Sequence, residues 1–248
     1  MKSEFTIDQI RNKGQAKKNL QYKNKLQERT LGYGRWIPRL LSVYVTWVLL
    51  KIFPGIKPNS VSFMMMSVCV AGQVLLWKGF YAAGALLLYL SIILDKVDGE
   101  VARLKDEFTW TGNFLDSQFH FIFWLSFIAI GWGLYVRENN SAALTIGMVN
   151  MLLNIYIRYT RSSKEKLMFK MNPEIRDIRK IKFLHFDSII LQKLFALLCI
   201  LGREDIFTIL LFLAAFLSNT MIFLYFYLLI SGLTSVFVFF GNLGEKNI

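Results

Sequence analysis

Long apolar runs separated by short polar segments make up most of the chain after residue 57. A helix needs about 20 mostly apolar residues to cross a bilayer, whereas a helix of a soluble core keeps one polar face. The pattern predicts six membrane-spanning helices, at Val61–Trp77, Tyr81–Arg103, Thr111–Val136, Ala142–Arg161, Asp205–Ser218 and Met221–Phe240. Turn-forming residues at 77–79, 138–140 and 218–220 separate the runs. We therefore expect an all-α integral membrane protein.

Two further segments are apolar but are not predicted to cross the membrane. Residues 35–57 mix basic, aromatic and aliphatic side chains. If this segment crossed the membrane, Arg39 and Lys51 would leave only a short uncharged core between them. This composition predicts an amphipathic helix lying in the membrane interface. Residues 188–201 are interpreted in the same way, as interfacial or partly buried. The expected organisation is a basic cytoplasmic extension at 1–34, an interfacial helix at 35–57 and a six-helix transmembrane domain at 58–242.

Charge orients the expected bundle. The chain is 54% hydrophobic and 19% charged, with a formal net charge of +12. Residues 1–57 hold 12 Lys or Arg against 3 Asp or Glu, and residues 158–187 hold 9 against 4. Because basic residues gather on the cytoplasmic side, both termini are expected there, in a bacterial-type cell membrane. The basic segments adjoin the spans, which favours contact with the lipid bilayer over nucleic acid.

Acidic residues inside two of the expected spans are the candidate chemistry. An ionisable residue in a span costs about 2.5–3.5 kcal/mol on insertion scales, so such residues are usually functional. Asp95 and Asp98 are three positions apart and share one helix face, and Gly112, Asp116 and His120 are spaced by four on the next span. Converging carboxylates would repel unless a cation neutralised them. Oxygen ligands favour Mg²⁺, Mn²⁺ or Ca²⁺, and such ions also bind substrate phosphates.

Two other interpretations are open. The first is a solvated helix end, in which Asp95 pairs with Lys96 and Asp98 pairs with Arg103. Asp95 and Asp116 are each flanked by apolar residues, which argues against it. The second is an ion transporter whose carboxylates form a cation path, although the sequence has neither the discontinuous helices nor the paired half-repeats typical of that class.

The pattern from Asp95 to His120 reads D-x2-D-G-x2-A-R-x8-G-x3-D-x3-H. It resembles the signature of the CDP-alcohol phosphotransferases (CDP-alcohol phosphatidyltransferases), D-x2-D-G-x2-A-R-x8-G-x3-D-x3-D. Every fixed residue and gap agrees as far as Asp116, and only His120 departs, where the family has aspartate. Residues 57–62 and 201–205 resemble, more weakly, the openings of the family's first and fifth spans. The resemblance covers about residues 35–240.

This resemblance implies an enzyme that transfers a phospho-alcohol group, phosphatidyl or similar, from a CDP-alcohol to an acceptor hydroxyl and releases CMP. It also implies Mg²⁺ or Mn²⁺ as cofactor and a homodimer. The donor could be CDP-diacylglycerol or a smaller soluble CDP-alcohol. The implied metal ligands are Asp95, Asp98, Asp116 and His120. The implied nucleotide-binding residues are Asn59, Asp95, Asp98, Gly99, Ala102, Arg103 and Gly112.

His120 stands where the family has its expected general base, and with Asp116 it forms the candidate catalytic pair. Imidazole is a competent base near neutral pH, with an ordinary pKa of about 6.5. Three outcomes are open: His120 acts as the base, the protein binds nucleotide and metal without turnover, or another residue takes the role.

Basic residues flank the same expected cytoplasmic face, at Arg158, Arg161, Lys164 and Arg203. They could bind the phosphate of a phosphorylated acceptor. They could equally be the positive charge that the topology requires, in contact with lipid headgroups.

Overall fold

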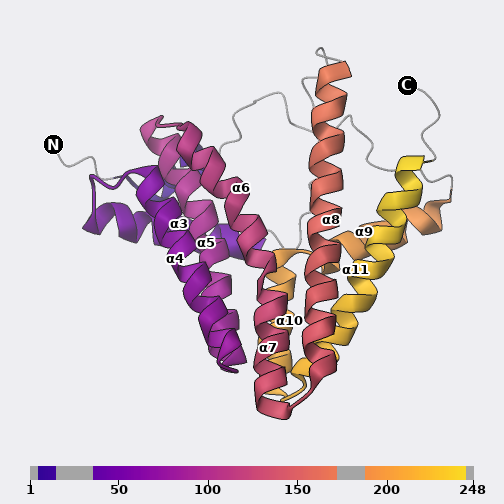
Figure 1. The fold of residues 1–248 in the computed structure, drawn as a ribbon. Coiled ribbons are helices and arrows are strands. Elements are labelled where there is room, and N and C mark those ends of the chain that lie inside the picture. The colour runs from indigo at the N-terminus through magenta and orange to yellow at the C-terminus, as the bar shows by residue number, and fades with distance from the viewer. Residues whose placement is uncertain (1–4, 15–35, 172–187, 244–248) are drawn as a thin grey trace.

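A computed structural model of the chain describes residues 5–14, 36–171 and 188–243, and these residues form helices without a strand (Figure 1). The predicted all-α fold is confirmed. The elements are α1 (Ile7–Gln9), η1 (Ile10–Gly14), α3 (Trp36–Ile52), α4 (Pro58–Trp77), α5 (Tyr81–Lys105), α6 (Trp110–Trp124), α7 (Ser126–Glu138), α8 (Ser141–Met171), α9 (Ile189–Leu201), α10 (Glu204–Phe216) and α11 (Thr220–Leu243).

Four described helical stretches are long and apolar enough to cross a membrane: Pro58–Trp77, Trp110–Glu138, Ser141–Thr160 and Thr220–Phe240. Helix α5 has 25 residues, but its C-terminal part carries the acidic and basic residues of the motif. Helix α10 has 13 residues, fewer than a bilayer needs. The two remaining expected spans therefore exist as helices, and the count of six spans stays a prediction.

The turns lie where the sequence placed them. Gly79, Asn139 and Ser218 have positive φ values of 81°, 51° and 55°. Glycine and asparagine adopt this left-handed conformation at the end of a helix more readily than other residues. These turns end α4, α7 and α10 and let the chain reverse.

The expected third span is broken, which the sequence pattern did not indicate. Helix α6 ends at Trp124 and α7 begins at Ser126, because the amide of Leu125 donates to the carbonyl of Ile122 three residues back, at 3.0 Å. The hydroxyl of Ser126 also donates to the carbonyl of Phe123. Hydrogen bonds to the carbonyl three residues back tighten a helix. A serine hydroxyl that takes up a backbone carbonyl bends it.

Aromatic side chains fill the centre of the bundle. Phe207 of α10 meets Phe123 and Phe127 with ring centroids 5.5 and 4.9 Å apart, in edge-to-face contacts. It also meets Tyr227 of α11 at 5.2 Å. These four rings are fully buried, and edge-to-face pairs contribute about 0.5–1.5 kcal/mol beyond burial. The cluster fixes α10 against α6 and α7.

Helix α3 presents apolar side chains outward and hydroxyls inward. Ser42 and Thr46, one turn apart, are fully buried and donate to the two carboxylate oxygens of Glu100 on α5, at 2.6 and 2.5 Å. Its exposed residues include Leu40, Tyr44 and Val48. The predicted helix at 35–57 is thus present, while its interfacial placement stays a prediction. The segment at 188–201 is likewise helical, as α9, and mostly exposed.

We expect Thr46→Val to destabilise the protein by about 1–3 kcal/mol, because valine leaves one oxygen of the buried Glu100 carboxylate without its donor. Thermal unfolding of the detergent-solubilised chain measures the loss. Thr145→Val removes the same hydroxyl from an exposed position on α8 and serves as the control. Equal unfolding temperatures for the two variants would show that the hydrogen bond from Thr46 to Glu100 contributes nothing.

Residues 5–14 pack against the C-terminal end of α5. Ile10 is fully buried, and the ammonium of Lys13 donates to the carbonyl of Leu104 at 3.1 Å and to the carboxylate of Asp106 at 2.8 Å. The side chain of Arg103 donates from Nε to the carbonyl of Gly14. Part of the expected extension at 1–34 is therefore bound to the helix that carries the motif. The rest lies outside the described residues.

Candidate functional site

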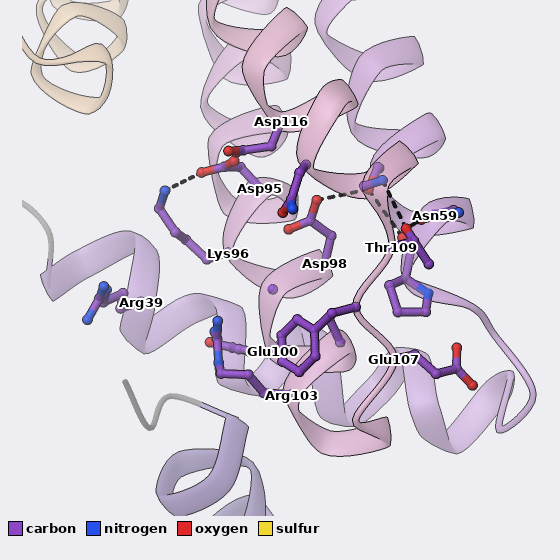
Figure 2. A pocket seen from close by; sticks show the side chains of 17 residues that line it. Arg39, Asn59, Asp95, Lys96, Asp98, Glu100, Arg103, Glu107, Thr109 and Asp116 are labelled. Atoms are coloured by element: carbon purple, nitrogen blue, oxygen red, sulfur yellow. Dashed lines mark hydrogen bonds and ion pairs between the residues drawn. The ribbon is translucent and has the colours of Figure 1, made fainter. Parts of the chain in front are cut away.

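A pocket of about 470 Å³ lies between the N-terminal end of α4, the C-terminal half of α5 and the first turns of α6 (Figure 2). Eight of the residues singled out in the sequence line it: Asn59, Asp95, Asp98, Gly99, Ala102, Arg103, Gly112 and Asp116. Arg39 of α3 and Glu107 and Phe108 of the α5–α6 loop complete its edge. The motif is therefore gathered around one pocket.

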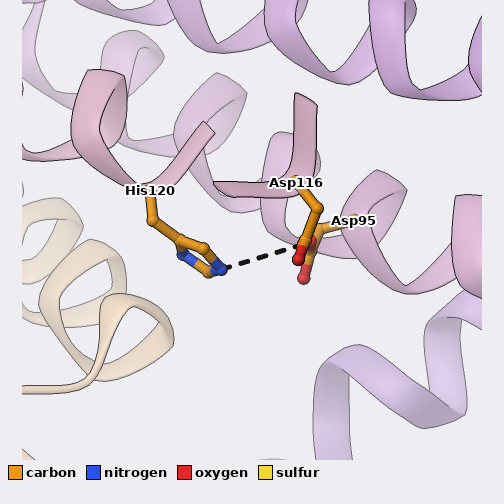
Figure 3. A group of neighbouring side chains, drawn as sticks. All are labelled: Asp95, Asp116 and His120. Atoms are coloured by element: carbon orange, nitrogen blue, oxygen red, sulfur yellow. Dashed lines mark ion pairs between the residues drawn. The ribbon is translucent and has the colours of Figure 1, made fainter. Parts of the chain in front are cut away.

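Asp95, Asp116 and His120 form a compact donor group beside this pocket (Figure 3). One ligand atom from each lies within 4.8 Å of the other two. Donor atoms that share an ion at about 2.0–2.6 Å can be separated by up to about 5 Å. Two carboxylates and an imidazole suit Mn²⁺ well and Mg²⁺ less well, since Mg²⁺ prefers oxygen. The residues fit a divalent cation.

Asp98 lines the same pocket but is held from the other side. Ser62 of α4 donates its hydroxyl to Asp98 Oδ2 at 2.9 Å. The expected pair of Asp98 with Arg103 does not appear among the described hydrogen bonds and ion pairs. No role was predicted for Ser62, which lies one turn after Pro58 and is buried on α4.

Asp95 pairs with Lys96, as the helix-end interpretation expected. The carboxylate is also buried, at 8% exposure for the residue, and it remains in the donor group with Asp116 and His120. The ion pair and the donor group therefore coexist on one carboxylate. Lys96 supplies positive charge at the wall of the pocket (Figure 2).

The first turn of α6 is tied to α4. Thr109 caps α6 by accepting from the amide of Gly112 at 3.0 Å, and it donates to Asn59 Oδ1 at 2.7 Å. A Cβ at Gly112 would lie 3.1 Å from Thr109 Oγ1 and 3.3 Å from Asn59 Oδ1. This motif glycine therefore allows the approach of Asn59, and Thr109 is a contributor that the sequence interpretation missed.

Glu204 is a third residue for which no role was predicted, after Ser62 and Thr109. His120 Nδ1 lies 2.6 Å from Glu204 Oε1, while Nε2 lies 3.9 Å from Asp116 Oδ1. Glu204 is the first residue of α10 and was quoted only as part of a weak resemblance. No spacing rule could connect residues 84 positions apart.

The basic residues proposed for an acceptor are placed unequally. Arg158 of α8 is half-buried and near enough to His120 for their charges to interact. Arg203 forms a two-point ion pair with Asp205, at 3.0 and 2.7 Å. The side chains of Arg161 and Lys164 lie outside the described residues.

The described residues form helices, four stretches of which are apolar and long enough to cross a membrane, with a carboxylate-lined pocket between α4, α5 and α6. The profile of the CDP-alcohol phosphatidyltransferase family matches residues 56–230. The chain belongs to this family, as its motif predicted.

Two relatives extend this comparison. The chain is 32% identical over 90 residues to the inner membrane protein YnjF of Escherichia coli; the match covers 36% of this chain and 43% of that protein, less than half of each. The structure is similar to the crystal structure of the Mycobacterium tuberculosis phosphatidylinositol phosphate synthase with CDP-DAG bound. The TM-score is 0.56 and the identity 17%, over 84% of this chain and all of that one. This second likeness concerns the fold.

Proposed function

We propose that this protein transfers a phospho-alcohol group from a CDP-alcohol to an acceptor hydroxyl and releases CMP, with a divalent cation, at the cytoplasmic membrane face. The observation that carries the proposal is the donor group of Asp95, Asp116 and His120 within 4.8 Å, beside the pocket that the family's motif lines. Membership of the family supports the reaction class.

Asp95, Asp98, Asp116 and His120 are the proposed ligands of Mg²⁺ or Mn²⁺. When bound, the cation offsets the negative charge of the diphosphate and the charge that develops during transfer. Asp98 is oriented for this role by Ser62. Of the two metals, the imidazole ligand favours Mn²⁺.

The nucleotide is proposed to occupy the pocket beside Asn59, Gly99, Ala102, Arg103 and Gly112. A Cβ at Gly99 would lie 3.1 Å from the guanidinium of Arg103, so glycine leaves the Arg103 side chain free to lie along the helix. Arg103 supplies positive charge for a phosphate, and Asn59 is fixed by Thr109. These contacts would hold the cytidine diphosphate against α5.

In the proposed step, the acceptor oxygen forms a bond to the phosphorus that carries the alcohol. The bond from that phosphorus to the bridging oxygen breaks, and CMP leaves with this oxygen. With Nδ1 donating to Glu204, only Nε2 of His120 has an unshared electron pair, so this nitrogen takes the acceptor's proton when it is not bound to the cation. His120 and Asp116 thus form the proposed catalytic pair.

CDP-diacylglycerol is the proposed donor, because the similar structure contains CDP-DAG and the pocket adjoins helices that can cross a membrane. Arg158, Arg161 and Arg203 are the proposed contacts for a phosphorylated acceptor, and Arg158 is near enough to His120 for their charges to interact. Six spans, cytoplasmic termini and a homodimer belong to the same proposal.

Release of CMP from CDP-diacylglycerol by the purified chain tests the reaction. We expect release with Mn²⁺ or Mg²⁺ and its loss on chelation with EDTA, because the clustered carboxylates then lack a counter-ion. Activity should return when either metal is restored. No CMP from CDP-diacylglycerol or from small soluble CDP-alcohols, together with retained Mn²⁺ binding, would instead indicate a family member without turnover. Cation flux into proteoliposomes without nucleotide would indicate a transporter.

A further inference from the structure

The imidazole of His120 lies between carboxylates from two different helices. On one side Glu204 Oε1 of α10 is 2.6 Å from Nδ1, and on the other Asp116 Oδ1 of α6 is 3.9 Å from Nε2. The side chains of His120 and Glu204 are both 17% exposed. The shorter contact is a hydrogen bond and the longer one is not. The two ring nitrogens therefore have different partners.

We propose that Glu204 is a positioning residue that holds the His120 ring with Nε2 directed at Asp116 and Asp95. An ionised carboxylate can only accept hydrogen bonds, so Nδ1 is the donor to Glu204. In neutral imidazole the unshared electron pair then lies on Nε2, which faces the donor group (Figure 3). Histidines that bind a metal usually donate their other ring N–H in this way. That this arrangement serves the reaction at the site rests on the proposed function.

Packing one turn further along both helices keeps Glu204 opposite His120. Phe123 follows His120 by three residues, Phe207 follows Glu204 by three, and their ring centroids are 5.5 Å apart. Both rings are fully buried. Phe119 adds a contact to the His120 ring at 5.3 Å between centroids. The hydrogen bond between Glu204 and His120 is thus accompanied by a contact between buried aromatic rings of α6 and α10.

Glu204 is the first residue of α10. Its neighbour Asp205 is paired with Arg203, whereas Glu204 contacts His120.

The ring nitrogens can be observed directly, because the chain has only 2 histidines. In full-length His185→Ala protein labelled with ¹⁵N-histidine, the remaining signals come from His120. We expect the shifts of a single tautomer with Nδ1 protonated and Nε2 bare, and a mixture of tautomers after Glu204→Ala. This measurement needs neither nucleotide nor turnover, so its result is independent of whether CMP is released.

Binding of Mn²⁺, followed by electron paramagnetic resonance, provides the second measurement. We expect Glu204→Ala to weaken Mn²⁺ binding by about 10–100-fold, as is typical for a residue that orients a ligand. If Glu204 acts only through His120, Glu204→Ala has no further effect in a His120→Ala background. Glu138→Ala removes an exposed carboxylate at the far end of α7 and should leave binding unchanged.

Glu204→Gln, which keeps the length of the side chain, provides the same double-mutant comparison should the alanine variant fail to fold. The proposal is overturned if substitution of Glu204 leaves the His120 ring signals and the Mn²⁺ affinity as in the parent. It is also overturned if the substitution weakens Mn²⁺ binding equally in the absence of His120.

Discussion

Asp95→Asn is expected to reduce CMP release by roughly 10³-fold. Asp95 is buried and belongs to the donor group with Asp116 and His120. Asparagine keeps the shape but removes the charge that would bind the cation. A divalent ion commonly contributes several kcal/mol of transition-state stabilisation, and each 1.36 kcal/mol changes the rate about tenfold.

Asp106→Asn is the matched control for Asp95. Asp106 lies on the same helix, at the C-cap of α5, with φ of 55°, which asparagine tolerates. Its carboxylate is exposed and contacts Lys13 rather than the pocket. We expect Asp106→Asn to keep the parent's rate. If Asp95→Asn also keeps that rate, with the same dependence on metal, Asp95 is not a ligand.

His120→Ala is expected to lower CMP release by about 10²–10⁴-fold, the range typical of removing a general base. The hydrogen bond to Glu204 and the approach of Nε2 to Asp116 are both lost in this variant. His120→Asp introduces the aspartate of the signature that the motif resembles, and we expect it to recover part of the rate. The same release assay, run with saturating metal, separates this effect from weaker metal binding.

His185→Ala, at the chain's other histidine, should leave the rate unchanged. A parent that releases no CMP beside an active His120→Asp variant would show that imidazole does not serve as the base. In that case the chain has kept the pocket and lost turnover. Equal rates for the parent and His120→Ala would show instead that another residue takes the proton.

The fold could be predicted in outline because its signals are local. Apolar runs and turn residues such as Gly79 and Asn139 placed the helix boundaries, since hydrophobicity and a left-handed turn conformation depend on the residue itself. The break at Leu125 was not predicted, because it depends on which backbone carbonyls accept from the Leu125 amide and the Ser126 hydroxyl. Apolar side chains flank Ser126 on both sides of that break, so the hydrophobic pattern does not mark it.

The candidate site was predicted to the extent that it lies on two consecutive helices. Asp95, Asp98 and Asp116 share a pocket because a short loop joins α5 to α6 and both helices pack against α4. Sequence spacing could not show that Ser62 of α4 donates to Asp98, nor that Thr109 donates to Asn59. These contacts depend on the angles at which helices pack.

The sequence by itself thus determined the helical class, the order of the helices, the motif and the family to which the chain belongs. Each of these follows from residue identity and from spacing along one or two helices. The tertiary structure alone decided which atoms face each other: Glu204 against His120, Glu100 against Ser42 and Thr46, and Lys13 against the end of α5. Each partner comes from a segment distant in the chain, and only packing of the aromatic and aliphatic core brings such segments together.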